Sequence, residues 1–189
     1  MRPGTRPPRA AWPARSLANV DPLRVPAPEV DEASLRRALG RFATGVCVAT
    51  TVHREVDHAM TVSAFTSVSL EPPLVLVCVE LEARFHEAVT ASGLWAVSVL
   101  QADARPAAEW LSTRGRPLHG QLNRVPHRRG PLTGAALLEQ SLAAMECRTE
   151  AIHPGGDHSI VVGEVIGVWI RANTGGPLLY HRGDYRHLK

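Results

Sequence analysis

Cysteine is scarce in this 189-residue chain, and metal-binding spacing is missing. The three cysteines, Cys47, Cys78 and Cys147, lie far apart in apolar surroundings, and none forms a CxxC motif or a Cys/His pair with zinc spacing. We therefore expect no metal site and no disulfide framework, but three buried free thiols. Free thiols suit a reducing compartment, so the sequence predicts a cytoplasmic protein.

Long apolar runs and the common catalytic motifs are also missing. No stretch approaches the ~20 apolar residues of a membrane span, so we expect no membrane association. The chain has no GxGxxG fingerprint after a strand, no Walker loop, no GxSxG elbow and no HExxH pair. A sequence with so little catalytic machinery of its own favours a protein that positions a cofactor, which then supplies the chemistry.

Basic charge is confined to the N-terminus. Residues 1–28 hold 7 of the 15 prolines and five arginines against one acid, Asp21, so this segment carries a formal charge of +4. The rest of the chain has 16 basic and 17 acidic residues, a formal charge of −1. We predict a disordered Pro/Arg-rich tail over 1–30 and one folded domain over 31–189. A nucleic-acid binder is disfavoured, because the domain has no basic excess with which to neutralise phosphates.

The remaining pattern predicts a mainly β fold with three added helices. Long β-branched runs and a tight turn at 153–157 favour an antiparallel barrel over a doubly wound sheet. Gly163 and Gly167 inside one run indicate bulges or sharp curvature. The Arg-, Gly-, His- and Pro-rich segment 114–133 is predicted to be a loop with little regular structure, of the kind that forms lids or binding segments. The expected helices cover 31–42, 84–92 and 104–112, and the expected strands cover 46–52, 58–62, 74–80, 94–100, 142–153, 158–172 and 177–181.

Hydroxyl side chains cluster where one of these strands is expected to bend. Positions 61, 63, 66, 67 and 69 are all Ser or Thr, and extended residues 61, 63, 65 and 67 would share one face. Small hydroxyls and exposed backbone N–H groups suit the polar edge of a flat heterocycle or a phosphate. An ordinary Ser/Thr-rich strand and turn is the alternative interpretation, because such runs are common.

Four motifs together resemble the flavin reductase family, whose fold is the FMN-binding split barrel, an antiparallel barrel of Greek-key type. They are FATGVCVATT at 42–51, MTVSAFTSVSLEPPLVLVCV at 60–79, GDHSIVVGEV at 156–165 and PLLYHRGDYRHL at 177–188. The resemblance implies an NAD(P)H:flavin oxidoreductase that reduces FMN, or FAD, with NADH or NADPH as hydride donor. It also implies a homodimer that supplies reduced flavin to a partner monooxygenase in a two-component system.

The resemblance assigns roles to particular residues. One segment would line the isoalloxazine ring and ribityl chain, the next strand end would bring its backbone to the flavin, and a helix N-terminus would meet the phosphate. His158 would be the catalytic residue near the nicotinamide or flavin. Tyr185 would cover the ring. Because it lies near the C-terminus, it could equally well only seal the end of the barrel. The expected cofactor-binding residues are Thr61, Val62, Ser63, Ala64, Phe65, Thr66, Ser67, Cys78, Val79, Glu80, Arg84, Phe85 and Tyr185.

The chain departs from the family at the phosphate-binding stretch. Where the family has a Ser-Ser-Arg-Thr-like sequence, this chain has Glu82-Ala83-Arg84-Phe85, which has no hydroxyl side chain and adds a carboxylate. Arg84 can still bind phosphate, but the choice between FMN and FAD stays open, and Phe85 fits a packing role equally well. Two other functions also stay open. One is a split-barrel enzyme that keeps its flavin, and the other is a non-catalytic flavin- or haem-binding module, which would not consume NAD(P)H.

Overall fold

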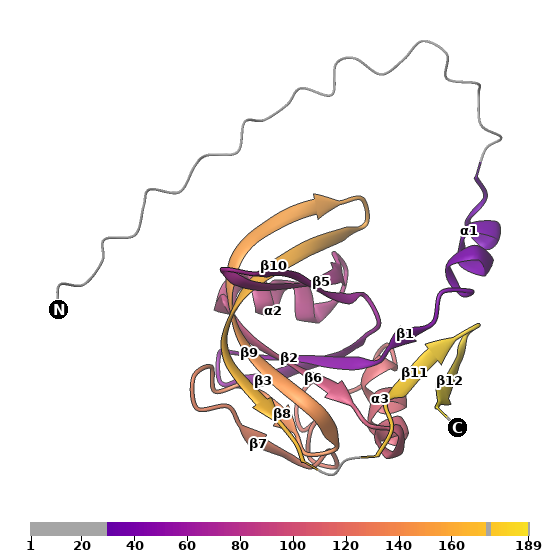
Figure 1. Cartoon of the computed structure of the whole chain (residues 1–189). Coiled ribbons are helices and arrows are strands. Elements are labelled where there is room, and N and C mark those ends of the chain that lie inside the picture. Colours follow the sequence, from indigo (N-terminus) through magenta and orange to yellow (C-terminus); the bar gives the residue numbers. More distant parts are fainter. Residues whose placement is uncertain (1–29, 173–174, 189) are drawn as a thin grey trace, which may run out of the picture.

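The computed structural model describes residues 30–172 and 175–188 (Figure 1). The tail predicted over 1–30 therefore lies outside the described residues, apart from Val30. The three α-helices of this part are α1 (Glu32–Leu39), α2 (Arg84–Ser92) and α3 (Arg105–Ser112), and a short 3-10 turn, η1 (Ala102–Ala104), precedes α3. None of these helices has the length and apolar character needed to cross a membrane.

Twelve strands make up most of the described chain, which confirms the prediction of a mainly β fold with added helices. The strands are β1 (Thr44–Gly45), β2 (Cys47–His53), β3 (Val56–Val62), β4 (Phe65–Leu70), β5 (Pro73–Glu80), β6 (Leu94–Leu100), β7 (His127–Arg129), β8 (Ala136–Leu138), β9 (Ser141–Gly155), β10 (His158–Ile170), β11 (Leu178–His181) and β12 (Asp184–His187). Seven of them correspond to the seven strands expected from the sequence, and the other five, β1, β4, β7, β8 and β12, are short strands of two to six residues that the sequence did not predict.

Seven strands form one antiparallel sheet in the order β3-β2-β6-β9-β10-β5-β4. The long β9–β10 hairpin joins its two halves and curves around the molecule (Figure 1). A second sheet has the order β1-β11-β12, and β7 pairs with β8 alone. This antiparallel arrangement confirms the predicted fold class and rules out a doubly wound parallel sheet.

The core shows why two glycines interrupt β10. The register between β9 and β10 shifts beside Gly163 and again beside Gly167, as the sequence predicted. A Cβ atom on Gly163 would lie 2.5 Å from Cζ2 of Trp95, whose side chain is completely buried. A side chain at Gly163 would therefore collide with the ring, and the glycine lets the strand pass directly over it.

Two segments each contain a strand that the sequence did not predict. The hydroxyl-rich run bends only at Ser63, and Phe65–Leu70 is strand β4, paired with β5. β4 is an edge strand with both faces partly exposed, so it lacks the apolar alternation that marks a strand. The segment 114–133 was expected to be a loop with little regular structure, and the regular structure within it is the three-residue strand β7, His127–Arg129. Three polar residues are too short a run to predict a strand.

Candidate functional site

A cleft of ≈ 420 Å³ lies between β3, the turn from β5 into α2, and the segment that follows α3. It brings together four of the predicted cofactor-binding residues: Thr61 on β3, Glu80 at the end of β5, and Arg84 and Phe85 at the start of α2. α2 packs against β2 and α3 packs against β3, so the two helices support the walls of the cleft.

The chain turns sharply beside this cleft. β3 ends at Val62, and the main chain bends at Ser63 before β4 begins at Phe65. The N–H group of Cys78 donates a hydrogen bond of 3.0 Å to the carbonyl oxygen of Ala64, which holds the bend against β5. Ser63 and Ala64 are exposed, as are the next two hydroxyl residues, Thr66 and Ser67. The bend therefore presents hydroxyls and main chain to a ligand.

Several predicted residues direct their side chains into the protein instead. Val62, Val79 and Phe85 are buried in one apolar cluster, so their side chains pack in the core. The hydroxyl of Thr61 donates a hydrogen bond of 2.8 Å to the carbonyl oxygen of Ala108 on α3. This hydroxyl ties β3 to α3. The burial of Phe85 fits the second role expected from the sequence, which is packing in the core.

His158 lies directly across the sheet from Glu80, at the start of β10. Its Nδ1 is 2.7 Å from Oδ1 of Asp157, and this hydrogen bond is the main reason why the pKa of Asp157 is lowered. The N–H group of Leu81 donates to the carbonyl oxygen of Asp157 at 3.0 Å, so the β9–β10 turn is fastened to the end of β5. The His158 side chain is 42% exposed and lies outside the 420 Å³ cleft.

Tyr185 lies on a different side, where β12 meets α3. Its ring packs edge-on to Tyr180 at 5.4 Å, and the guanidinium of Arg105 lies 5.6 Å from its centre. Burial against the core raises the pKa of its hydroxyl, while a hydrogen bond with Ser112 opposes the shift. Ser112 lines the cleft, so Tyr185 adjoins the site without lining it.

The three thiols divide into two classes. All are free, but only Cys47 and Cys147 are buried, and Cys78 is partly exposed. The prediction of three buried thiols was therefore wrong for Cys78, because β5 buries only alternate side chains. Burial raises the pKa of Cys47 to about 12, and burial together with the nearby Glu146 raises that of Cys147 to about 12.

The segment after α3 supplies residues that sequence reasoning missed. Arg114 forms an ion pair with Glu80, with N–O distances of 2.8 and 2.9 Å to the two carboxylate oxygens. Arg116 donates to the carbonyl oxygens of Thr113 (2.9 Å) and Ala59. The available signal was the high density of arginines in the long segment after α3. From the sequence, this segment was interpreted only as a loop, and no arginine in it was assigned a role.

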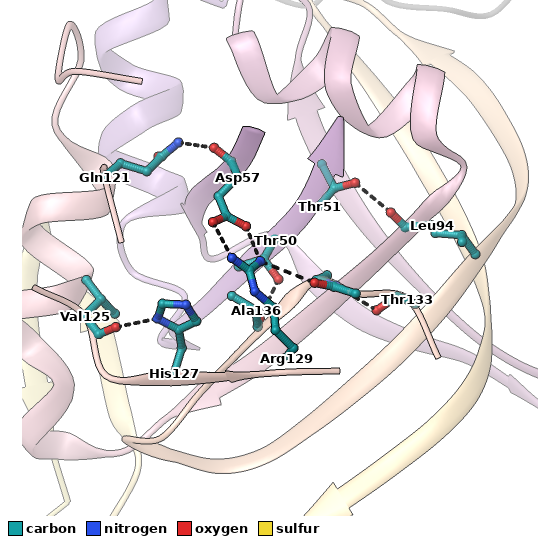
Figure 2. Close-up of polar contacts among 12 residues, drawn as sticks. Thr50, Thr51, Asp57, Leu94, Gln121, Val125, His127, Arg129, Thr133 and Ala136 are labelled. Carbon is teal, nitrogen blue, oxygen red and sulfur yellow. Dashed lines mark hydrogen bonds and ion pairs between the residues drawn. The ribbon is translucent and has the colours of Figure 1, made fainter. Parts of the chain in front are cut away.

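Gln121 anchors this segment to the sheet. Its side chain is buried and donates a hydrogen bond of 2.6 Å to the carbonyl oxygen of Asp57 on β3 (Figure 2). The carboxylate of Asp57 pairs in turn with Arg129 on β7 (Figure 2). Nε1 of Trp110 on α3 donates to the carbonyl oxygen of Gln121 at 2.7 Å. The wall of the cleft is thus held from β3, α3 and β7 together.

Two basic groups that line the cleft have lowered pKa values, mainly because they are partly buried. Burial, followed by the charge of Arg84, lowers the pKa of Arg116. Burial also lowers the pKa of His58, with smaller effects from His53 and Arg84. Nδ1 of His58 is buried and has no hydrogen-bond partner within the described part of the chain. A cleft with these properties suits a ligand that carries negative charge.

Residues 39–189 match the sequence profile of the flavin reductase like domain. The chain belongs to the flavin reductase family. A relative from Rhodococcus sp., an NADH-dependent flavin reductase, is 39% identical over 165 residues, which are 86% of this chain and 89% of that protein.

Two solved structures of flavin reductases are also similar. BorF, the flavin reductase component of a bacterial two-component tryptophan halogenase, is 42% identical with a TM-score of 0.79, over 84% of this chain and 98% of BorF. SgcE6 from Streptomyces globisporus, an NADH:FAD oxidoreductase solved in complex with NAD and FAD fragments, is 37% identical with a TM-score of 0.79. That match covers 86% of this chain and 98% of SgcE6.

The residues of this flavin reductase fit a flavin nucleotide. The exposed bend at Ser63–Ala64 offers hydroxyls and main chain to the polar edge of a ring, and the arginines of the cleft suit a phosphate. His158 stands at the same end of β5 and β10. Within residues 30–172 and 175–188, no group of three His, Cys, Asp or Glu side chains is placed to hold a metal ion.

Proposed function

We infer that this protein is an NADH-dependent flavin reductase that reduces FMN or FAD and supplies the reduced flavin to a partner monooxygenase. One observation carries the inference. The exposed bend at Ser63–Ala64 is hydrogen-bonded to β5 at Cys78, and β5 then leads into an arginine-lined cleft. This arrangement supports a ring site next to a phosphate site, and the chain is 39% identical to an NADH-dependent flavin reductase.

A bound flavin would supply the redox chemistry, because its ring can accept a hydride from NADH, which would leave as NAD⁺. The protein has to align two rings and exclude water, a task of positioning. Ser63 and Thr66 offer hydroxyls to the polar edge of the flavin and to its ribityl chain. Main-chain N–H groups beside the pyrimidine would stabilise the negative charge that develops on reduction.

The Asp157–His158 pair orients one side chain toward the nicotinamide. A carboxylate only accepts hydrogen bonds, so Nδ1 of His158 carries the proton that Asp157 accepts. In the neutral ring, Nε2 is then left as an acceptor, able to hold the carboxamide of the nicotinamide or take up a proton. We propose that Tyr185 does not line the site, but packs beside α3 and closes that end of the protein.

We also propose a homodimer, because the apolar side chains of α1 and of Phe42 after it are exposed in the part of the chain that the structure describes. None of the eight residues of α1 is buried, and the apolar side chains Leu35, Leu39 and Phe42 are all exposed. A second copy of the chain would cover this face. Light scattering on the purified protein should give twice the chain mass, and Leu39→Glu should shift it toward the monomer. The free thiols support our proposal of a cytoplasmic location.

The decisive experiment is the oxidation of NADH and NADPH by the purified protein, with and without FMN, FAD or riboflavin. We expect NADH oxidation that depends on added flavin, and flavin that is removed by gel filtration. Stoichiometric retained flavin would instead indicate an enzyme that keeps its cofactor. Flavin binding without oxidation of either nucleotide would refute the reductase and leave a binding module. A partner monooxygenase would be tested by its product formation with this protein as the only source of reduced flavin.

A further inference from the structure

Two guanidinium groups in the cleft lack an ionic partner. Among the residues that the structure describes, neither Arg84 nor Arg116 forms an ion pair, although both line the cleft. Within the part of the chain that the structure describes, the hydrogen bonds that Arg84 and Arg116 donate all go to neutral acceptors. Arg84 donates to the carbonyl oxygen of Arg116 at 2.6 Å, so the two residues are in direct contact.

The neighbouring arginine is different. Arg114 already pairs with Glu80 through both carboxylate oxygens, so its charge is balanced. Glu82 is the other acid that lines the cleft, and it forms no ion pair among the described residues. Three arginines against two glutamates leave the cleft with one excess positive charge even before a ligand enters.

Arg116 is also held rigidly in place. Its guanidinium donates to the carbonyl oxygens of Ala59 and Thr113 and to Oε1 of Gln121 at 3.3 Å. Gln121 is itself buried and fastened to β3. A half-buried cation that is fixed by neutral groups has lost water without gaining a counter-charge, which is costly unless an anion binds there. The lowered pKa of Arg116 has the same physical cause.

We propose that Arg116 joins Arg84 in binding the phosphate of a nucleotide ligand, and so replaces contacts that the Glu82-Ala83 stretch does not offer. Guanidinium groups bind phosphate oxygens with two parallel hydrogen bonds, a geometry that a flat, preorganised side chain favours. This inference rests on the proposed flavin reductase function. The phosphate belongs either to the flavin or to the nicotinamide dinucleotide, and the test separates the two.

The test measures flavin binding by fluorescence quenching with riboflavin, which lacks a phosphate, and with FMN. In Arg116→Gln, FMN affinity should fall about tenfold or more, the effect of one charge-assisted hydrogen bond, while riboflavin affinity stays within about twofold. Arg84→Gln should behave alike. Arg148→Gln is the matched control, because Arg148 is an exposed arginine on β9 that pairs with Glu164.

A second arm assigns the phosphate to its source. If FMN and riboflavin affinities are both unchanged in Arg116→Gln, but the KM for NADH rises about tenfold with riboflavin as acceptor, the phosphate is that of the nicotinamide dinucleotide, and the site stands. If neither ligand is affected, the proposal is wrong. Equal loss of riboflavin and FMN affinity also overturns it, because Arg116 would then only support the wall of the cleft.

A third arm keeps the inference separate from the proposed function. Inorganic pyrophosphate should raise the melting temperature of wild-type protein and of Arg148→Gln, but not that of Arg116→Gln. If the protein neither binds flavin nor oxidises NADH, the reductase fails while this arm still tests the anion site. Arg116→Lys covers the risk of misfolding: it keeps the charge, so it should retain part of the pyrophosphate shift. No shift in wild-type protein would refute the site.

Discussion

Replacing Glu146 with Gln should destabilise the protein, although the change removes a buried charge. Glu146 lies on β9 and is completely buried. Its Oε1 accepts hydrogen bonds from the N–H groups of Leu132 (3.0 Å) and Thr133 (2.8 Å) and from the hydroxyl of Thr133 (2.8 Å). Its Oε2 accepts from Nε1 of Trp169 at 3.2 Å. The carboxylate therefore fastens the β7–β8 turn to β9 and β10.

The magnitude follows from counting donors. A glutamine has one acceptor oxygen, and if this oxygen keeps the three bonds to the turn, its NH₂ group faces the indole N–H of Trp169. One hydrogen bond to a charged acceptor is then lost and two donors meet, while relief from burying a charge offsets part of the loss. We expect a loss of about 2 kcal/mol in the free energy of unfolding. Glu146→Ala leaves all four donors without this acceptor and should lose about 3–5 kcal/mol.

Urea unfolding monitored by tryptophan fluorescence measures both values, since Trp169 reports directly on the site. Glu139→Gln is the control, because Glu139 is an exposed carboxylate just after β8, and its unfolding free energy should change by less than about 0.5 kcal/mol. If Glu146→Gln is as stable as wild-type protein or more stable, the desolvation cost of the carboxylate outweighs its hydrogen bonds, and the reasoning is refuted.

Two further predictions concern the core. Gly163→Ala should destabilise the protein by about 1–3 kcal/mol, because its Cβ would lie 2.5 Å from the buried ring of Trp95; an unchanged melting temperature would mean that the ring moves aside. A thiol reagent at pH 7 should modify one cysteine per folded chain, which peptide mapping should identify as Cys78. Raising the pH to 9 should not expose Cys47 or Cys147 to reaction, because a pKa of about 12 keeps both thiols protonated; fast labelling of either would contradict their burial.

The sequence predicted the elements whose signal is local. β10 is a long β-branched run with two bulge glycines, and α2 ends at a glycine with φ 65°, so both were predictable from neighbouring residues. The bend at Ser63 was predictable as well. β4 was missed, because an edge strand whose two faces are both exposed to solvent has no alternation of apolar and polar residues.

The site could be predicted only in part, for a related reason. Which side chain faces a ligand depends on partners that are distant in sequence. The hydroxyl of Thr61 donates a hydrogen bond to a carbonyl oxygen of α3. The charge of Glu80 is balanced by Arg114, which lies 34 residues further along the chain. No spacing rule connects such pairs before the fold is known. Arg116 was missed for the same reason, because its isolation from carboxylates is a property of the cleft.

The strand order has a consequence for the way this protein is made. β5 pairs with β4, its neighbour in sequence, but its other partner is β10, which follows only after α2, β6, α3 and the whole β7–β9 region. Closing so long a loop costs entropy and slows folding. During synthesis, the edge of β5 that ends at Glu80 stays unpaired until the ribosome has released β10, and an unpaired apolar edge invites aggregation. The strand edge that adjoins the ligand site therefore stays open until late in synthesis, and chains that stop before β10 should be found in inclusion bodies.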